Sequence, residues 1–293
     1  MITVFTPTYN RVSTLKRLYK SLQKQTCMDF EWLIIDDGST DATESEIRQW
    51  MKEGNPFTIR YIKTSNGGKH RAINLGVQKA RSEAFFIVDS DDTLPPRSID
   101  IIAKNFSAIV TNAKFAGICG LKADMTTKQP LYNSRKAAGK DCSMLNIRYK
   151  YHIKGDMAEV FKTSVLKSFP FPSFEGENFL NEAVVWNRIA KKYIMHYISD
   201  ILYYCQYLPD GLTASIRQRY RTCPLGTKLF YGELIKDKNI PTLEKLKTFL
   251  LYWRYLCFNK KAKNILSGVP FVSFLFILPG ATLFIWDKMK EKK

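Results

Sequence analysis

The chain has 293 residues, 45% of them hydrophobic, which is enough for a buried core and argues against a largely disordered protein. Its 45 Lys and Arg against 27 Asp and Glu give a net charge of +18, which favours anionic partners: nucleic acid, an anionic membrane face or phosphorylated small molecules. The six cysteines form no CxxC pair or tight framework, which argues against disulfide stapling, so we expect reduced cytoplasmic thiols.

The first 110 residues predict a repeated alternation of strand and helix. Apolar and β-branched runs predict strands at residues 2–6, 30–35, 58–62 and 84–88. Helical spacing of apolar residues predicts helices at residues 12–22, 43–52 and 69–80. Strands buried on both faces and separated by helices indicate an α/β fold, with a doubly wound, mostly parallel central sheet and helices on both faces. In such sheets ligands bind at the carboxyl ends of the strands.

From about residue 113 the alternation loosens, and a basic stretch reaches Lys154. Later elements are predicted as a helix at about 181–192, one or two strands at 194–204 and an amphipathic helix at 243–258. The inward residues of that last helix are predicted to be Leu246, Phe249, Leu250, Trp253 and Leu256.

Residues 269–286 form an uncharged stretch of borderline membrane-spanning length. Pro270, Pro279 and Gly280 weaken a single span, whereas basic residues on both sides suit a segment lying in an anionic leaflet. These flanking residues are Lys260, Lys261 and Lys263 before the stretch, and Lys288, Lys290, Lys292 and Lys293 after it. A buried pair of C-terminal helices is the alternative. We expect peripheral membrane contact, and, because the N-terminus carries no secretory signal, a cytoplasmic protein on the inner face of the cell membrane.

An acidic cluster, Asp89-Ser90-Asp91-Asp92, directly follows the fourth predicted strand. Three acids within four residues repel one another unless a cation is bound or water solvates them. A nucleoside diphosphate leaving group also needs charge neutralisation, and a hard divalent cation anchored by one or two carboxylates supplies it. The cluster therefore predicts a divalent cation site, with solvated or capping carboxylates as the alternative.

Three further polar loops follow the other predicted strands. They are Thr6-Pro7-Thr8-Tyr9-Asn10, Asp36-Asp37-Gly38-Ser39 and Asn66-Gly67-Gly68-Lys69, the last followed by Arg71 and Asn74. The first could pack an aromatic ring against a base, the second offers a carboxylate to a nucleobase or ribose, and the third attracts phosphate to a helix start. Ordinary turns and helix caps are the alternative for each loop.

In order and spacing, these four motifs resemble the GT-A fold family 2 glycosyltransferases. The resemblance covers about residues 1–110 and implies an inverting transferase that uses a sugar nucleotide, commonly linked to uridine diphosphate, with Mg²⁺ or Mn²⁺ at the aspartate cluster. It implies that Thr8 and Asp37 contact nucleobase and ribose, while Asp89 and Asp91 lie against ribose, metal and diphosphate. The expected donor-binding residues are Thr6, Pro7, Thr8, Tyr9, Asn10, Asp36, Asp37, Asn66, Gly67, Lys69, Asn74, Asp89, Ser90 and Asp91.

The sequence pattern also predicts a division of the chain. We expect a nucleotide-sugar-binding half at 1–110, an acceptor-side half of the same catalytic domain at 111–225, and a basic, partly apolar C-terminal helical extension at 226–293. The expected acceptor is a hydroxyl of a glycan or a lipid-linked molecule.

An inverting transfer needs a base that removes the proton of the acceptor hydroxyl. The family commonly uses an Asp within a Glu-Asp pair, six residues before an Arg on a helix. Glu182 precedes Arg188 by six residues, so it takes the place of that Asp, although Asn181-Glu182 departs from the usual pair. Glu177 is the competing base. The expected acceptor-binding residues are Asp156, Glu177 and Trp186.

Two other classes of function fit less well. A metal-dependent nucleotidyltransferase also uses strand-end carboxylates, but it would want a Gly-rich loop after the first strand, and residues 6–10 contain no glycine. A nucleic-acid-binding protein would suit the net charge, but the sequence has no zinc-finger or RNP signature, so we expect no nucleic acid partner. The three histidines lack metal-ligand spacing, which argues against zinc.

Overall fold

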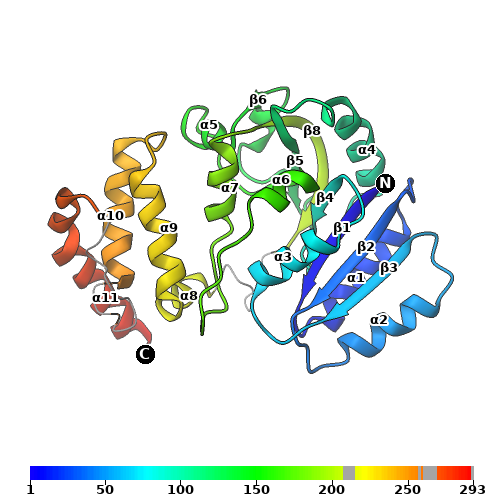
Figure 1. Ribbon diagram of the computed structural model, residues 1–293, viewed down its shortest axis with the longest axis horizontal. Helices are drawn as coiled ribbons and strands as arrows, with labels where there is room; N and C mark the ends of the chain where they lie inside the picture. Colours follow the sequence, from blue (N-terminus) through cyan, green and yellow to red (C-terminus); the bar gives the residue numbers. More distant parts are fainter. Residues whose placement is uncertain (207–214, 257–258, 260–268, 292–293) are drawn as a thin grey trace. The chain divides into compact units, whose positions relative to one another are not determined.

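The computed structural model describes residues 1–206, 215–256, 259 and 269–291, and these divide into two compact units (Figure 1). We call the described parts of Met1–Phe171 and Val185–Tyr207 the sheet unit, and those of Pro172–Val184 and Leu208–Lys293 the helical unit. The predicted division at residues 110 and 225 stays a prediction. Phe258 and the predicted basic flank at Lys260, Lys261, Lys263, Lys292 and Lys293 lie outside the described residues.

Within the described residues, one eight-stranded sheet runs in the order β3-β2-β1-β4-β7-β5-β8-β6. Its strands are β1 (Ile2–Thr8), β2 (Phe30–Asp36), β3 (Thr58–Lys63), β4 (Ala84–Ile87), β5 (Phe115–Asp124), β6 (Asp141–Cys142), β7 (Met157–Lys162) and β8 (Ile194–Cys205). The first four strands pair in parallel, whereas β7 runs antiparallel between β4 and β5. The order reverses beside β1, so the carboxyl ends of β1, β2 and β4 meet at a topological switch point.

Helices surround this sheet (Figure 1). In the sheet unit they are α1 (Val12–Gln23), α2 (Thr43–Lys52), α3 (Lys69–Lys79), α4 (Ser98–Ile109), η1 (Ser134–Ala137), α5 (Met144–Tyr149), α6 (Thr163–Ser168) and α7 (Ala183–Ala190), whose first two residues belong to the helical unit. The predicted α/β fold with a doubly wound, mostly parallel sheet is confirmed.

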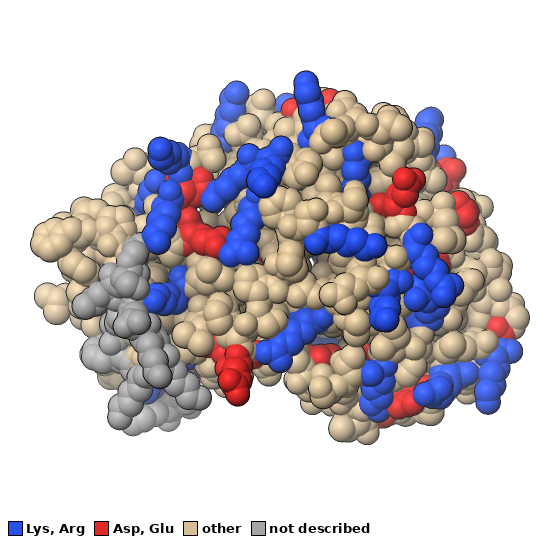
Figure 2. Space-filling view, in the orientation of Figure 1, with Lys and Arg blue, Asp and Glu red and all other residues tan. Residues whose placement is uncertain are grey.

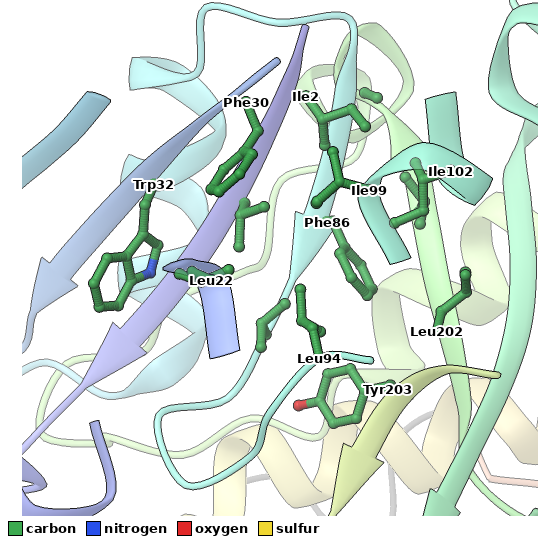
Figure 3. Close-up of a cluster of buried hydrophobic side chains, with 14 of the residues drawn as sticks. Ile2, Leu22, Phe30, Trp32, Phe86, Leu94, Ile99, Ile102, Leu202 and Tyr203 are labelled. Atoms are coloured by element: carbon green, nitrogen blue, oxygen red, sulfur yellow. The ribbon is translucent and has the colours of Figure 1, made fainter. Parts of the chain in front are cut away.

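The core of the sheet unit explains why β1 and β2 are apolar along their whole length. Both strands are buried at every position, because helices cover both faces of the sheet. On one face the rings of Tyr19, Trp32 and Trp50 stack, with centroids 4.5–6.0 Å apart. Figure 3 shows Phe86 of β4 and Ile99 of α4 in the same apolar cluster. This packing fixes the strand ends that carry the polar loops.

The loosening predicted from residue 113 is wrong, because β5 is a ten-residue strand in the middle of the sheet. Two glycines and Lys122 interrupt its apolar pattern and hide it from periodicity. The structure supplies the reason for Gly117: a Cβ there would collide with the Val160 carbonyl of β7.

The helical unit contains α8 (Ile216–Thr222), α9 (Pro224–Lys236), α10 (Thr242–Leu256), η2 (Phe271–Phe276) and α11 (Ile277–Glu291). Of the predicted inward residues of α10, Phe249, Trp253 and Leu256 are buried, and Leu246 and Leu250 are half-buried. Among the described residues, one helical segment, Phe271–Met289, is long and apolar enough to cross a membrane, and 17% of it is buried.

Candidate active site

The loop after β4 carries the acidic cluster to the carboxyl edge of the sheet. Asp89 forms an ion pair with Lys69 at the start of α3, with 2.6 Å between Nζ and Oδ1. Burial alone would raise the pKa of Asp89, but the positive charges of Lys69 and Lys122 outweigh it and hold the pKa below its usual value. Asp89 is therefore ionised at neutral pH.

The next two carboxylates are less easily ionised. Burial, and then the charge of Asp89, raise the pKa of Asp91. Burial, and then the charges of Asp89 and Asp91, raise the pKa of Asp92 to about 7. The loop thus concentrates more negative charge than the nearby lysines neutralise.

β8 and α1 hold this loop in place. The Tyr203 hydroxyl accepts a hydrogen bond from the backbone N–H of Asp89 at 2.8 Å, and Asp92 accepts one from the backbone N–H of Gln206 at 3.0 Å. Arg17 donates to the Asp91 carbonyl at 3.0 Å and to the Gln206 side chain at 2.9 Å. The acidic loop is therefore shaped by contacts from distant parts of the sequence.

Lys122 and Tyr203 are site residues that the sequence analysis missed. The ammonium of Lys122 lies 4.2 Å from the centre of the Tyr203 ring. Burial would lower the pKa of Lys122, but the charges of Asp89, Glu159 and other acids raise it. A lone lysine in the buried run of β5 was the available signal; Tyr203 had none, because it lies in an ordinary aromatic strand.

Beside the acidic loop, the loops after β2 and β3 enclose a cavity of about 230 Å³. Its lining residues are Asp37, Thr64, Ser65, Gly67, Arg71, Ala72 and Leu75. Asp37 accepts hydrogen bonds from the N–H groups of Gly67 and Gly68 at 2.7 and 2.8 Å. Burial raises its pKa in spite of these two bonds. Gly38 has φ +86°, and a Cβ there would lie 2.9 Å from the Asn66 nitrogen, so a glycine lets the two loops meet.

The side chains of three expected donor-binding residues form hydrogen bonds within the fold. The Asp36 carboxylate is fully buried and accepts from the Ser39 N–H and the Tyr61 hydroxyl, both at 2.7 Å. Thr6 accepts from the Trp32 indole at 2.9 Å inside the core. The Asn74 amide makes two 2.8 Å bonds to the backbone of Phe171. These residues position the loops around the site.

The end of β1 and the loop after it contribute Thr8, Tyr9 and Asn10 to the same edge of the sheet. Among the described residues, the buried Thr8 hydroxyl finds no hydrogen-bond partner. The Tyr9 side chain is 48% exposed, which leaves its ring open to stacking. Asn10 donates its N–H to Ser39 at 2.9 Å and accepts from the Thr40 N–H at 2.8 Å, so it ties this loop to the one after β2. Of the remaining expected donor residues, Pro7 and Ser90 are buried and Asn66 is exposed.

The acidic loop fits a divalent cation that is shared with a ligand. Within the described part of the chain, no three His, Cys, Asp or Glu side chains converge as a complete metal site. Mg²⁺ is usually held by one or two carboxylates together with phosphate oxygens of a ligand. Asp89 and Asp91 can provide the carboxylates. The charge of Asp89 contributes to the raised pKa of Asp91, and a bound cation would offset this repulsion between the two carboxylates.

Glu182 immediately precedes α7 and is half-buried. Asn181 orients the start of this helix: its side-chain oxygen accepts from the Ala183 N–H at 2.9 Å, and its amide donates to the Tyr220 hydroxyl at 2.6 Å. Further along α7, Trp186 stacks on Phe161 with 4.6 Å between ring centres, so its ring serves packing within the sheet unit.

The other two acceptor-side acids lie in contrasting surroundings. Glu177 is buried, and its two oxygens accept from the N–H groups of Leu225 and Gly226 at 2.7 and 2.8 Å, at the start of α9. This arrangement makes Glu177 a cap of α9. Asp156 is exposed, and its charge reaches Lys122.

The fold and the strand-end site together define an α/β domain of the glycosyltransferase class. Residues 3–144 match the family model described as Glycosyl transferase family 2, so this part of the chain is a domain of that family. The chain is 26% identical to GalNAc(5)-diNAcBac-PP-undecaprenol beta-1,3-glucosyltransferase of Campylobacter jejuni, over 90% of this chain and 84% of that protein. Further curated relatives match over 35–36% of this chain, and these matches cover only 11–36% of the relatives' own length.

Solved structures share the fold. S. aureus TarS 1–349 in complex with UDP-GlcNAc is 19% identical with a TM-score of 0.63, covering 97% of this chain and 80% of that one. The mannosyltransferase PcManGT from Pyrobaculum calidifontis in complex with GDP-Man and Mn²⁺ is 19% identical with a TM-score of 0.59, covering 98% and 87%. The expected GT-A type of fold is confirmed.

Proposed function

We propose that this glycosyltransferase uses a nucleoside diphosphate sugar, a UDP-sugar by preference, as its donor. The observation that carries the proposal is the pairing of the Asp37 cavity with the acidic loop at the ends of β2 and β4, on either side of β1. A nucleobase bound in the cavity would contact Asp37. The ring of Tyr9 and the Thr8 hydroxyl, which has no hydrogen-bond partner among the described residues, lie at the end of β1, the strand between β2 and β4. The named ligands of TarS and PcManGT support a nucleotide sugar.

Asp89 and Asp91 would hold Mg²⁺ or Mn²⁺, which PcManGT contains as Mn²⁺. Bound there, the cation supplies neutralising charge to the diphosphate leaving group. Lys69, paired with Asp89, adds a second positive charge on the same side. The residues of the chain thus bind the diphosphate and stabilise its charge as the sugar departs.

The transfer proceeds in one inverting step, with Glu182 as base. Its carboxylate takes the proton of the acceptor hydroxyl while that oxygen bonds to the anomeric carbon and the bond from that carbon to the diphosphate breaks. Glu182 is preferred to Glu177 because both oxygens of Glu177 already accept hydrogen bonds from α9. Asp156, exposed near Lys122, is the candidate carboxylate for binding the acceptor.

The acceptor is a hydroxyl of a glycan or lipid-linked molecule, and the enzyme works at the inner face of the cell membrane. The Campylobacter relative is named for an undecaprenol-linked substrate, which supports a lipid-linked acceptor. The apolar segment Phe271–Met289 supports peripheral membrane contact.

Isothermal titration with UDP and with GDP, each with Mn²⁺ and with chelator, tests the donor. We expect UDP to bind in the presence of Mn²⁺, and Asp91→Asn to abolish the Mn²⁺-dependent part of the affinity. The matched control is Asp141→Asn, which changes an exposed acid of β6. Binding of neither nucleotide, or equal binding by Asp91→Asn, would overturn the proposal.

A further inference from the structure

The helical unit presents an apolar stripe to solvent. Large side chains of η2 and α11 are exposed at a spacing of three or four residues, which places them along one side of the helix. They are Phe271 (85% exposed), Leu275 (76%), Leu278 (78%), Ile285 (52%) and Met289 (64%), with Thr282 completing the series. We call these residues the apolar stripe. Water-exposed apolar side chains gathered in this way mark an interaction surface.

The opposite side of the same segment is docked on α10. Ser273, Gly280 and Asp287, seven residues apart, are all buried. A Cβ at Gly280 would lie 2.7 Å from the Trp253 Cβ and 2.9 Å from the Arg254 nitrogen, so the two helices touch at backbone level. The stripe therefore belongs to a helix whose inner side is already occupied.

An ion-pair cluster fixes this docking. The Asp287 carboxylate receives two hydrogen bonds from Arg254 of α10, at 2.8 and 2.6 Å, and an ion pair from Arg221 of α8 at 2.9 Å. Burial would raise the pKa of Asp287, but the hydrogen bonds and charges of the two arginines lower it. We call these three residues the Asp287 clamp.

The clamp argues against a helix that crosses the bilayer. A spanning helix would have to leave α10 and expose Asp287 and its arginines, or carry along a partner helix that contains Glu244, Lys245 and Lys247. A helix that lies in the plane of the interface keeps the clamp on the protein side and buries only the stripe.

The charges beside the stripe are cationic, which complements an anionic lipid surface. Among the side chains described for η2 and α11, Asp287 is the only acid, and it is neutralised within the clamp. Lys288 is exposed, lies 5.1 Å from the centre of the Phe284 ring, and follows the half-exposed Trp286. Exposed tryptophan and lysine side chains are both typical of a membrane interface. In Figure 2 the left edge of the view, above the grey atoms, shows tan atoms without blue or red ones.

We infer that η2 and α11 form an in-plane anchor whose apolar stripe inserts into the surface of an anionic phospholipid bilayer. The inference deepens the membrane location proposed above and does not depend on the transfer reaction. The clamp holds the anchor against α10, so the helical unit stays at the membrane surface without a spanning segment.

Co-sedimentation with vesicles tests the inference. The full chain should bind vesicles that contain phosphatidylglycerol more strongly than vesicles of phosphatidylcholine alone, and added salt should weaken the binding. Leu275→Glu/Leu278→Glu should weaken binding at least about tenfold, because two side chains no longer enter the apolar layer. Leu243→Glu is the matched control, since Leu243 is 73% exposed on α10 but outside the stripe, and it should bind like wild type.

Two further readouts sharpen the outcome. The tryptophan emission should shift to shorter wavelength on vesicles in wild type, and Trp286→Phe should reduce that shift while binding persists. UDP titration of the double variant should match wild type, which separates this test from that of the donor site. Equal vesicle binding by wild type and the double variant would show that the stripe does not contact the membrane, and would overturn the inference. A wild-type chain that forms a dimer and does not bind vesicles, with a monomeric double variant, would also overturn it and would assign the stripe to a second copy of the chain.

Discussion

The acidic loop of the sheet unit and the buried acids of the helical unit use their carboxylates in opposite ways. In the sheet unit, Asp91 and Asp92 crowd Asp89 at a strand end, and burial with mutual repulsion raises the pKa of both. In the helical unit, Glu177 accepts two backbone N–H bonds and Asp287 lies between two arginines. Carboxylates whose oxygens are all hydrogen-bonded or ion-paired hold helices and loops together, whereas carboxylates crowded at one strand end favour the binding of a cation.

The units also differ in where they leave apolar surface. The sheet unit has a large cluster of buried aliphatic and aromatic side chains, part of which Figure 3 shows. The helical unit buries Tyr220, Tyr231 and Trp253 in a core of its own and still exposes the apolar stripe. The sheet unit thus carries the candidate donor site, and the helical unit carries the proposed membrane anchor.

The largest expected effect separates the two acids of the acceptor side. Glu182→Gln should lower kcat about 10²–10⁴-fold without changing donor affinity, because only the base is lost. Glu177→Gln should mainly lower the free energy of unfolding, since it weakens the cap of α9. UDP release from the donor and urea unfolding measure the two effects. An active Glu182→Gln enzyme beside a stable, inactive Glu177→Gln enzyme would exchange their roles.

The Asp287 clamp should contribute strongly to the free energy of unfolding. Asp287→Asn leaves Arg221 and Arg254 as buried charges without their acid, and we expect it to cost about 3–5 kcal/mol in the free energy of unfolding. Asp100→Asn is the control, because Asp100 pairs with Arg97 at the surface at 3.3 Å and should change stability by less than about 1 kcal/mol. Similar unfolding midpoints for the two variants would contradict the contrast drawn between the units.

Acid should destabilise the sheet unit through His70 at the start of α3. Burial, and then the charge of Arg71, lower the pKa of His70 to about 4. The unfolded histidine has a pKa of about 6.5, so it binds a proton first, and stability present above pH 6.5 is lost as the pH falls towards 4. We expect a loss of about 3 kcal/mol over this window.

His70→Gln should flatten that part of the curve of unfolding free energy against pH, and His152→Gln, which changes an exposed histidine, should leave it intact. The same slope in wild type and His70→Gln would show that other groups cause the acid sensitivity.

The smallest expected effect concerns the support of the acidic loop. Tyr203→Phe keeps the ring under Lys122 but removes the hydroxyl that bonds to the Asp89 N–H. We expect the Mn²⁺ concentration for half-maximal UDP binding to rise about tenfold. Tyr197→Phe, a buried tyrosine of the same strand, is the control. If both variants shift the Mn²⁺ requirement equally, the effect is general loosening of β8 and not positioning of the loop.

Much of the N-terminal half could be predicted from the sequence. Periodicity located α1 and α2 almost to the residue, and the strand runs located β1 to β4, because these elements are continuous in hydrophobic pattern. Periodicity could not locate β5, because two of its positions are glycines without an apolar signal: Gly117 lies close to β7 and Gly120 lies close to Leu202 of β8.

The sequence by itself determined the acidic loop, the polar loops after β1 to β3 and the apolar C-terminal segment, because each is a short continuous motif that is legible without its tertiary partners. Only the tertiary structure decided which members share the site: it turned Asp36 and Asn74 into supports, kept Asp37 in the cavity wall and brought Lys122 and Tyr203 to the loop. It also showed that Asp287 docks the apolar segment by its inner side. These roles depend on partners up to 114 residues away along the chain, and local pattern carries no information about such contacts.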